Sequence, residues 1–132
     1  MYKQPYLIEY PKIGNTIQGY ISVAEKETLI FDVKRVYWTY YTPEEVIRGG
    51  HAHHKLEQIL IAVAGKIIVE TEMPGSVKDR FILESPNVGL LLPTYCWHTM
   101  HYSHNSVQVC ISNMIYDESD YIRDYNEFKL IK

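Results

Sequence analysis

The sequence has little of what would mark several other classes of protein. Only two of its 132 residues are cysteines, and its 13 Lys and Arg form no basic block. A net charge of -3 without such a block argues against a nucleic-acid partner. No apolar run approaches the roughly 20 residues of a membrane span, and the first ten residues lack the apolar core of a signal peptide. We therefore expect a cytoplasmic protein with no membrane partner, in which Cys96 and Cys110 are buried free thiols.

Internal repeats, low-complexity segments and linkers are also missing, so we expect one domain over residues 1–132. What the sequence has is a turn signal about every ten residues between short strand-like stretches, which is typical of an all-β sandwich or barrel. The tail differs, because apolar residues in 118–129 recur at helical spacing and predict a short amphipathic helix. The expected strands cover residues 6–10, 17–23, 29–41, 58–64, 66–72, 80–83, 88–92, 96–103 and 107–114, the last two paired as a hairpin.

A histidine-rich stretch precedes the most apolar of these strands. His51 and His53 are two residues apart, so on a strand both imidazoles face the same side. Gln58 follows, then an apolar run that ends at Gly65. A third histidine, His98, lies downstream in the stretch Pro-Thr-Tyr-Cys-Trp-His. The pattern predicts a site with at least two imidazoles.

Together these two stretches resemble the paired motifs of the cupin superfamily. The order His-x-His, four residues, Gln58, six residues, Gly65 fits the first motif, with Gln in place of the usual Glu. Pro93 and His98 fit the second motif, while Tyr95 and Tyr102 replace its Gly and Asn. The resemblance implies an all-β, cupin-type jelly-roll barrel, here with a short C-terminal helix.

Two interpretations compete for the three histidines. In the first they bind zinc, iron or manganese, but the fourth cupin ligand is a carboxylate and Gln58 is a much weaker donor. In the second, neutral imidazoles remove a proton and return it elsewhere, because an imidazole pKa of about 6.5 lies near working pH. Gln58 would then orient a histidine or hold a substrate oxygen. His54, His101 and His104 fit surface positions.

A narrower resemblance covers residues 17–128. The block Arg48-Gly49-x-His51-Ala52-His53 and the tail from Tyr116 to Tyr125 are similar to dTDP-4-oxo-6-deoxyglucose 3,4-ketoisomerases, which move a keto group from C4 to C3. This family implies catalysis by His51 and His53 with no metal and no cofactor. The implied substrate is a dTDP-linked 4-keto-6-deoxyhexose. The expected substrate-binding residues are Arg35, Tyr37, Arg48, Gln58, Trp97, His98 and Arg123, with the three arginines on the diphosphate, Trp97 as a pocket wall and His98 near C4 of the sugar.

The family also implies a homodimer with exchanged N-terminal strands, and a product that is aminated to a 3-amino-3,6-dideoxy sugar. Within it we expect His51 to be the primary base and His53 to assist. The C4 configuration of the product stays open, and Gln18 and His98 are the positions that would bear on it. The alternatives are a metal-dependent cupin enzyme, a nucleotide-sugar 3,5-epimerase and a sugar-sensing cupin without catalysis.

Overall fold

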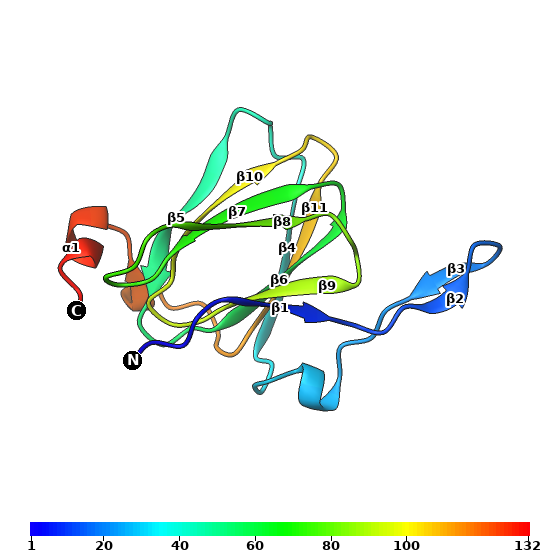
Figure 1. The fold of residues 1–132 in the computed structure, drawn as a ribbon, viewed down its shortest axis with the longest axis horizontal. Coiled ribbons are helices and arrows are strands. Elements are labelled where there is room, and N and C mark those ends of the chain that lie inside the picture. Colours follow the sequence, from blue (N-terminus) through cyan, green and yellow to red (C-terminus); the bar gives the residue numbers. More distant parts are fainter.

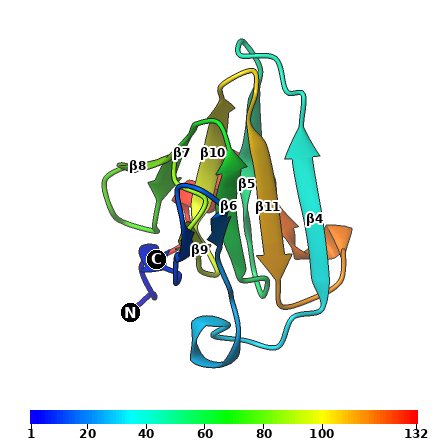
Figure 2. The ribbon, with the colours of Figure 1, turned by 90° about the vertical axis from the view of Figure 1, so that its right-hand side faces the viewer.

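Two five-stranded sheets pack face to face in the computed structural model, which describes residues 1–132 (Figure 1; Figure 2). The first sheet runs in the order β1 (Tyr6–Glu9), β9 (Val88–Leu92), β6 (Gln58–Ala64), β11 (Val107–Ser112) and β4 (Arg35–Tyr40). The second runs in the order β12 (Tyr121–Ile122), β5 (Ile47–His53), β10 (Trp97–Tyr102), β7 (Ile67–Glu72) and β8 (Asp79–Leu83). All pairs are antiparallel. The predicted all-β jelly roll is therefore confirmed.

Alternation along the strands places the core between the sheets. In β11 every second residue is buried, and in β4 partly buried and exposed residues alternate, as expected for strands with one covered face. The covered faces meet in a cluster that contains fully buried residues of both sheets. Its members include Leu60, Ala62, Ile67, Val69, Leu83, Leu90, Leu92 and Cys110. Both cysteines are buried and free, as the sequence predicted.

The predicted hairpin over residues 96–103 and 107–114 is wrong. β10 pairs with β5 and β7 in the second sheet, whereas β11 pairs with β4 and β6 in the first. The turn between them therefore crosses from one sheet to the other. Both strands have alternating patterns that suit either arrangement, so the pattern alone did not decide the partner.

The C-terminal segment is less helical than predicted. A 3-10 turn, η2 (Glu118–Asp120), leads into β12, which pairs with β5 opposite His53. The α-helix α1 spans only Tyr125–Lys129, because the Asp124 side chain accepts hydrogen bonds from the first backbone N–H groups and caps it there. Phe128 then packs with Ala52 and Ile122 on the outside of the second sheet. No helix of the chain is long and apolar enough to cross a membrane.

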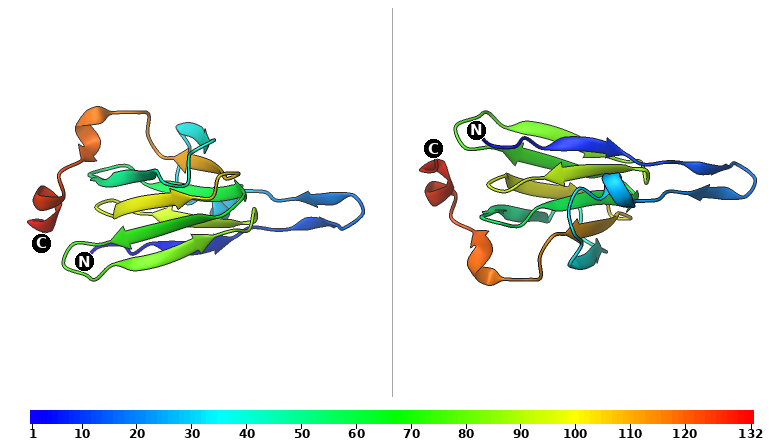
Figure 3. Two further views of the ribbon diagram at one scale, coloured as in Figure 1. Left: turned by 90° about the horizontal axis from the view of Figure 1, so that it is seen from above. Right: turned by 90° about the horizontal axis from the view of Figure 1, so that it is seen from below.

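A two-stranded hairpin projects from the barrel. β2 (Ile13–Asn15) and β3 (Gly19–Ile21) pair only with each other and extend away from the barrel, on the side opposite both termini (Figure 1; Figure 3). Every residue of the hairpin is exposed, including Ile17 at its tip. A short 3-10 turn, η1 (Lys26–Thr28), follows before the chain enters β4.

Candidate active site

The structure brings the three predicted histidines together between the two sheets. His51 and His53 lie on the same face of β5, and His98 of β10 pairs directly with His51 across the ladder. The ring centroid of His51 lies 5.0 Å from that of His53 and 4.8 Å from that of His98. His98 and His53 are 6.2 Å apart. Three imidazoles from two neighbouring strands therefore form one cluster.

An irregularity in the β5–β10 ladder places this cluster. The register shifts between His98 and Thr99, so that His98 lies opposite His51 and Thr99 opposite Gly49, with Gly50 unpaired between them. Gly49 has a φ of +83°, where a side chain is strained. A Cβ there would lie 2.7 Å from the backbone oxygen of His98. The glycine thus allows β10 to approach β5 closely at the histidines.

Burial keeps the cluster uncharged. Burial, then the neighbouring His98 and His53, lowers the pKa of His51 to about 2. Burial and then His98 lower the pKa of His53 to about 3, and burial lowers that of His98 to about 4. All three imidazoles are therefore neutral at pH 7 and have a lone pair to accept a proton.

Gln58 lies at the centre of a polar network beneath the cluster. The Tyr37 hydroxyl and the Cys110 thiol each lie 3.0 Å from Gln58 Oε1 and donate to it. These two donors turn the amide nitrogen of Gln58 toward His98, whose Nε2 is 3.5 Å away. On the other side of the ring, His98 Nδ1 lies 3.0 Å from the carbonyl oxygen of Cys96 and can only donate to it.

Because Nδ1 of His98 donates, its Nε2 is the acceptor for the Gln58 amide. Both ring nitrogens of His98 are therefore occupied, and His98 is held rigidly by protein groups. Gln58 performs this role where the general cupin motif has a carboxylate. The histidines and their neighbours form no group of three or more His, Cys, Asp or Glu arranged to hold a metal ion.

A cavity of about 270 Å³ opens beside the histidines, where β4 is an edge strand and β5 is covered only by the short β12. Two arginines face it without a carboxylate partner. Arg35 lies over the rings of Tyr37 and Tyr116, and its Nε is buried without a hydrogen-bond partner. The lining consists of Arg35, Tyr37, Thr39, Arg48, Gly49, His51, His98, Met100, Tyr102, Gln108, Tyr116 and Tyr121. Unpaired guanidinium groups beside neutral imidazoles suit an anionic ligand with an acid–base centre.

Three predicted substrate-binding residues, Gln58, Trp97 and Arg123, do not line this cavity, and neither does the predicted catalytic residue His53. Gln58 lies in the buried network beneath the histidines. Trp97 precedes the inward-facing His98, so it points to the opposite face of β10 and packs against Tyr125 and Phe128 of α1. We had predicted that Trp97 forms a wall of the pocket, but it is not part of this cavity. Arg123 is exposed, and both its Nε and Nη2 donate to the Glu118 carboxylate. It also covers the ring of Tyr121 at the cavity rim, so its charge is already neutralised by a partner.

A larger hollow of about 590 Å³ lies elsewhere, between the base of the projecting hairpin and the outer face of the first sheet. Its lining includes Lys12, Tyr20, Ile61 and Val63. It contains no histidine, cysteine or carboxylate, so it lacks groups for acid–base chemistry at neutral pH.

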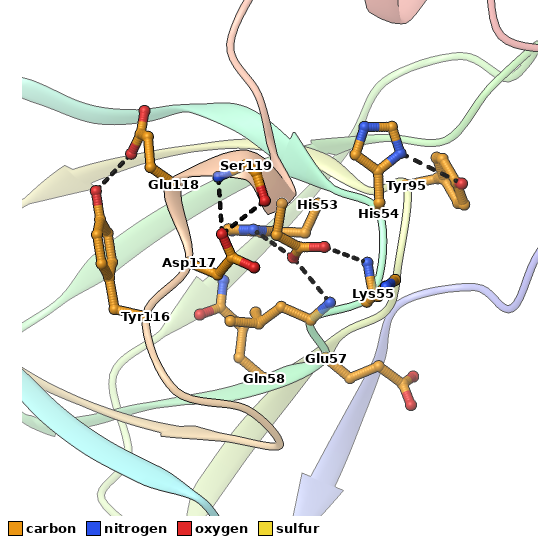
Figure 4. Close-up of polar contacts among 12 residues, drawn as sticks. His53, His54, Lys55, Glu57, Gln58, Tyr95, Tyr116, Asp117, Glu118 and Ser119 are labelled. Atoms are coloured by element: carbon orange, nitrogen blue, oxygen red, sulfur yellow. Dashed lines mark hydrogen bonds and ion pairs between the residues drawn. The ribbon is translucent and has the colours of Figure 1, made fainter.

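Sequence reasoning missed Asp120 and Cys110 as members of the site. Asp120 is buried, and its Oδ2 lies 3.3 Å from Nδ1 of His53. Figure 4 shows the labelled neighbours Asp117 and Ser119 of the C-terminal segment close to His53. Asp120 was within the tail that resembles the ketoisomerases, but we had assigned that tail to a helix. Nothing in the sequence pattern pairs Cys110 with Gln58, because the two strands meet only in the folded sheet.

Comparisons with known proteins found similar chains over almost the whole length of this one. A model of the family described as "FdtA: WxcM-like, C-terminal" matches residues 3–132. A TDP-4-oxo-6-deoxy-alpha-D-glucose-3,4-oxoisomerase from Aneurinibacillus thermoaerophilus is 37% identical over 124 residues, which are 93% of this chain and 88% of that protein.

Solved structures are similar over nearly the whole chain. A 3,4-ketoisomerase from Helicobacter canadensis has a TM-score of 0.91 and 29% identity, covering 98% of this chain and 97% of its own. A histidine-to-asparagine variant of the 3,4-ketoisomerase QdtA from Thermoanaerobacterium thermosaccharolyticum, in complex with TDP-4-keto-6-deoxyglucose, has a TM-score of 0.90 and 29% identity, covering 98% and 94%. The rmlC epimerase of Mycobacterium tuberculosis, with a TM-score of 0.75 and 14% identity over 89% of this chain and 66% of its own, shows the fold alone.

Proposed function

The chain belongs to the WxcM-like, C-terminal family, and from this membership we propose that it is a 3,4-ketoisomerase that moves the keto group of TDP-4-keto-6-deoxyglucose from C4 to C3. The observation that carries the proposal is the placement of neutral His51 in the lining of a cavity with two unpaired arginines, with neutral His53 next to it on the same strand face. We further propose that residues 1–132 form a single domain that performs the whole reaction.

The reaction only moves protons. One proton leaves C3 and one arrives at C4, while one leaves the C3 hydroxyl and one arrives at the C4 oxygen, so no atom is gained or lost. In our proposal His51 removes the C3 proton to give an enediolate, and His53 assists in the transfer to C4. His51 lines the cavity directly, which supports its role as primary base.

The developing charge on the enediolate oxygens needs hydrogen-bond donors. Tyr37 lines the cavity and is suited to hold the sugar, because its hydrogen bond to Gln58 fixes the hydroxyl before substrate arrives. Gln58 itself supports Tyr37 and His98 from beneath, since its amide is already bonded to protein groups. Arg35 and Arg48 are suited to hold the diphosphate, because a guanidinium grips phosphate oxygens in a fixed fork and neither has a carboxylate partner. His98 borders the sugar site as a fixed wall, since both its ring nitrogens are occupied.

A proton NMR time course with TDP-4-keto-6-deoxyglucose and chelator-treated protein tests the proposal. We expect the C3 proton signal to disappear and a C4 proton signal to appear, with coupling constants that give the gluco or galacto configuration. Conversion that starts only after a divalent metal is added would favour a metal-dependent cupin. Inversion at C3 and C5 with the keto group still at C4 would favour a 3,5-epimerase. An unchanged substrate under all conditions would contradict the proposal.

A histidine variant tests the assignment of the base. We expect His51→Asn to lower kcat by at least about 10²-fold, the usual contribution of general acid–base catalysis. His54→Asn is the matched control, because His54 follows the same strand but is exposed. Near-normal turnover of the His51 variant would contradict its role as primary base.

We also propose that the protein acts as a homodimer in which the β2–β3 hairpin of each copy packs on the other. The two strands of the hairpin pair only with each other and with no strand of the barrel. The hairpin nevertheless exposes the apolar side chains of Ile13, Ile17 and Ile21. Such an exposed apolar arm fits a subunit contact better than solvent. In this proposal the 3-keto product passes to an aminotransferase that makes a 3-amino-3,6-dideoxy sugar.

A further inference from the structure

Asp120 is a buried carboxylate held in one position by the backbone. Its Oδ1 accepts from the Lys55 N–H at 2.8 Å and its Oδ2 from the Leu56 N–H at 3.1 Å. Its own carbonyl oxygen accepts from the His54 N–H at 3.0 Å. Three successive N–H groups that follow His53 in the chain therefore bind one residue of the C-terminal segment, and Figure 4 shows how closely the two segments meet.

The same carboxylate reaches the catalytic cluster. Its Oδ2 lies 3.3 Å from Nδ1 of His53, and the side chains of both residues are almost fully buried. The ring is turned so that the N–H direction does not align with the oxygen, which leaves Nδ1 without a hydrogen-bond partner. Catalytic hydrogen bonds are often long or poorly aligned before substrate binds, and they tighten in the complex.

This contact sets His53 apart from the other histidines. Of the six histidines in the chain, only His53 has a ring nitrogen within 4.0 Å of a carboxylate oxygen. Nδ1 of His51 is also buried without a hydrogen-bond partner, but no carboxylate lies at ion-pair distance from it. Within the pair, His53 therefore has a carboxylate partner and His51 has none.

We propose that Asp120 is a positioning residue for His53: it keeps the ring proton on Nδ1, leaves Nε2 as the proton acceptor, and stabilises the imidazolium that forms when Nε2 takes up a proton. The inference rests on the proposed ketoisomerase function for its catalytic consequence, but not for the tautomer itself. A carboxylate that accepts from Nδ1 fixes both the tautomer and the orientation of an imidazole.

The surroundings of His53 make this partner necessary. The other charged or titratable groups around it are imidazoles, cations and a phenol, none of which favours an imidazolium. They are His51 and His54 around β5, His98 of β10, Arg35 of β4, and Tyr121 and Arg123 of the C-terminal segment. Burial, and after it the neighbouring imidazoles and cations, lower the pKa of His53. Asp120 supplies the one carboxylate at ion-pair distance from this ring.

Imidazole nitrogen NMR of 15N-labelled protein tests the tautomer without substrate. We expect neutral His53 to carry its proton on Nδ1 in the wild-type protein. In Asp120→Asn the amide can donate to Nδ1, so we expect the proton to move to Nε2. Asp117→Asn is the matched control, because Asp117 caps the same 3-10 turn through Ser119 without touching a histidine. A wild-type His53 protonated on Nε2 would overturn the proposal, even if the Asp120 variant did not fold.

Steady-state kinetics test the consequence. We expect Asp120→Asn to lower kcat by about 10²–10⁴-fold with little change in KM, because the substrate contacts remain. Asp117→Asn should keep wild-type kcat. A folded Asp120→Asn protein with wild-type kcat and unchanged tautomer would overturn the role of Asp120. A wild-type protein with no isomerase activity would instead contradict the proposed function, while the tautomer measurement would still decide the contact between Asp120 and His53.

Discussion

Arg35 lines the cavity and has a buried hydrogen-bond donor that no protein group satisfies, so it is the residue best suited to bind an anionic ligand. Its guanidinium lies between the rings of Tyr37 and Tyr116, and its buried Nε has no partner. We expect Arg35→Met to raise the KM for a TDP-sugar by about 10- to 100-fold, since a hydrogen bond to a charged group contributes about 1.5–3 kcal/mol. Arg80→Met is the control, because Arg80 is exposed on β8 outside the cavity. Equal KM values for the two variants would contradict a phosphate contact at Arg35.

At the scale of single residues, side-chain parity explains both the success and the failure of sequence reasoning. The period of two placed His51 and His53 on one face, and the structure has them together. The same rule, applied to Trp97 next to the inward His98, would have placed Trp97 outside, where the structure has it. The sequence did not reveal Asp120 as a site residue, because its partner His53 is remote in sequence. Only the pairing of β12 with β5 brings the two together.

At the scale of elements, the irregular pairing of β5 with β10 makes a sharp prediction. Gly49 and Gly50 both have positive φ, but a Cβ on Gly49 would meet the His98 backbone oxygen, whereas a Cβ on Gly50 would meet nothing within 4 Å. Both alanine variants carry the left-handed strain of about 1–2 kcal/mol. We expect Gly49→Ala to lose about 1–3 kcal/mol more, the usual cost of overpacking. Urea unfolding of the two variants measures the difference, and equal losses would show that β10 yields without cost.

Strand existence was easier to predict than strand partners. The bounds of β6 and β9 agree with the predicted strands 58–64 and 88–92, because their apolar runs are ended by strong turn signals. The run from residue 29 to 41 yields only β4, since an apolar pattern continues through the loop before it. The choice of sheet for β10 and β11, and the short β12, depend on contacts between distant segments that no local pattern encodes.

For the whole molecule, the projecting hairpin carries a prediction about assembly. The tip residue Ile17 and Ile21 of β3 are strongly exposed. We expect light scattering to show a dimer for the wild-type protein and a monomer for the double variant Ile17→Asp/Ile21→Asp. Val77→Asp is the control, because Val77 is equally exposed at a different corner of the barrel. A wild-type monomer, or a double variant that remains dimeric, would contradict a dimer built through the hairpin.

The buried histidines also predict how the stability of the whole molecule depends on pH. In the folded protein the pKa values of His51, His53 and His98 are lowered to about 2, 3 and 4, whereas an unfolded histidine titrates near 6.5. Above pH 6.5 both states are neutral, so these groups give no pH dependence. Below it the unfolded chain binds protons that the folded chain excludes. The free energy of unfolding therefore falls as the pH drops from about 6.5 toward 4.

The size of this effect separates the buried histidines from the exposed ones. Each fully excluded proton contributes a slope of about 1.4 kcal/mol per pH unit. We expect His98→Gln, which removes the most deeply buried ring, to lower the slope between pH 6 and 4.5 by up to that amount. Urea unfolding of the wild-type protein and of His98→Gln at several pH values measures the two slopes. Equal slopes for the wild-type protein and His98→Gln would mean that His98 is protonated in the folded state, and that the Gln58 amide does not face its Nε2 lone pair.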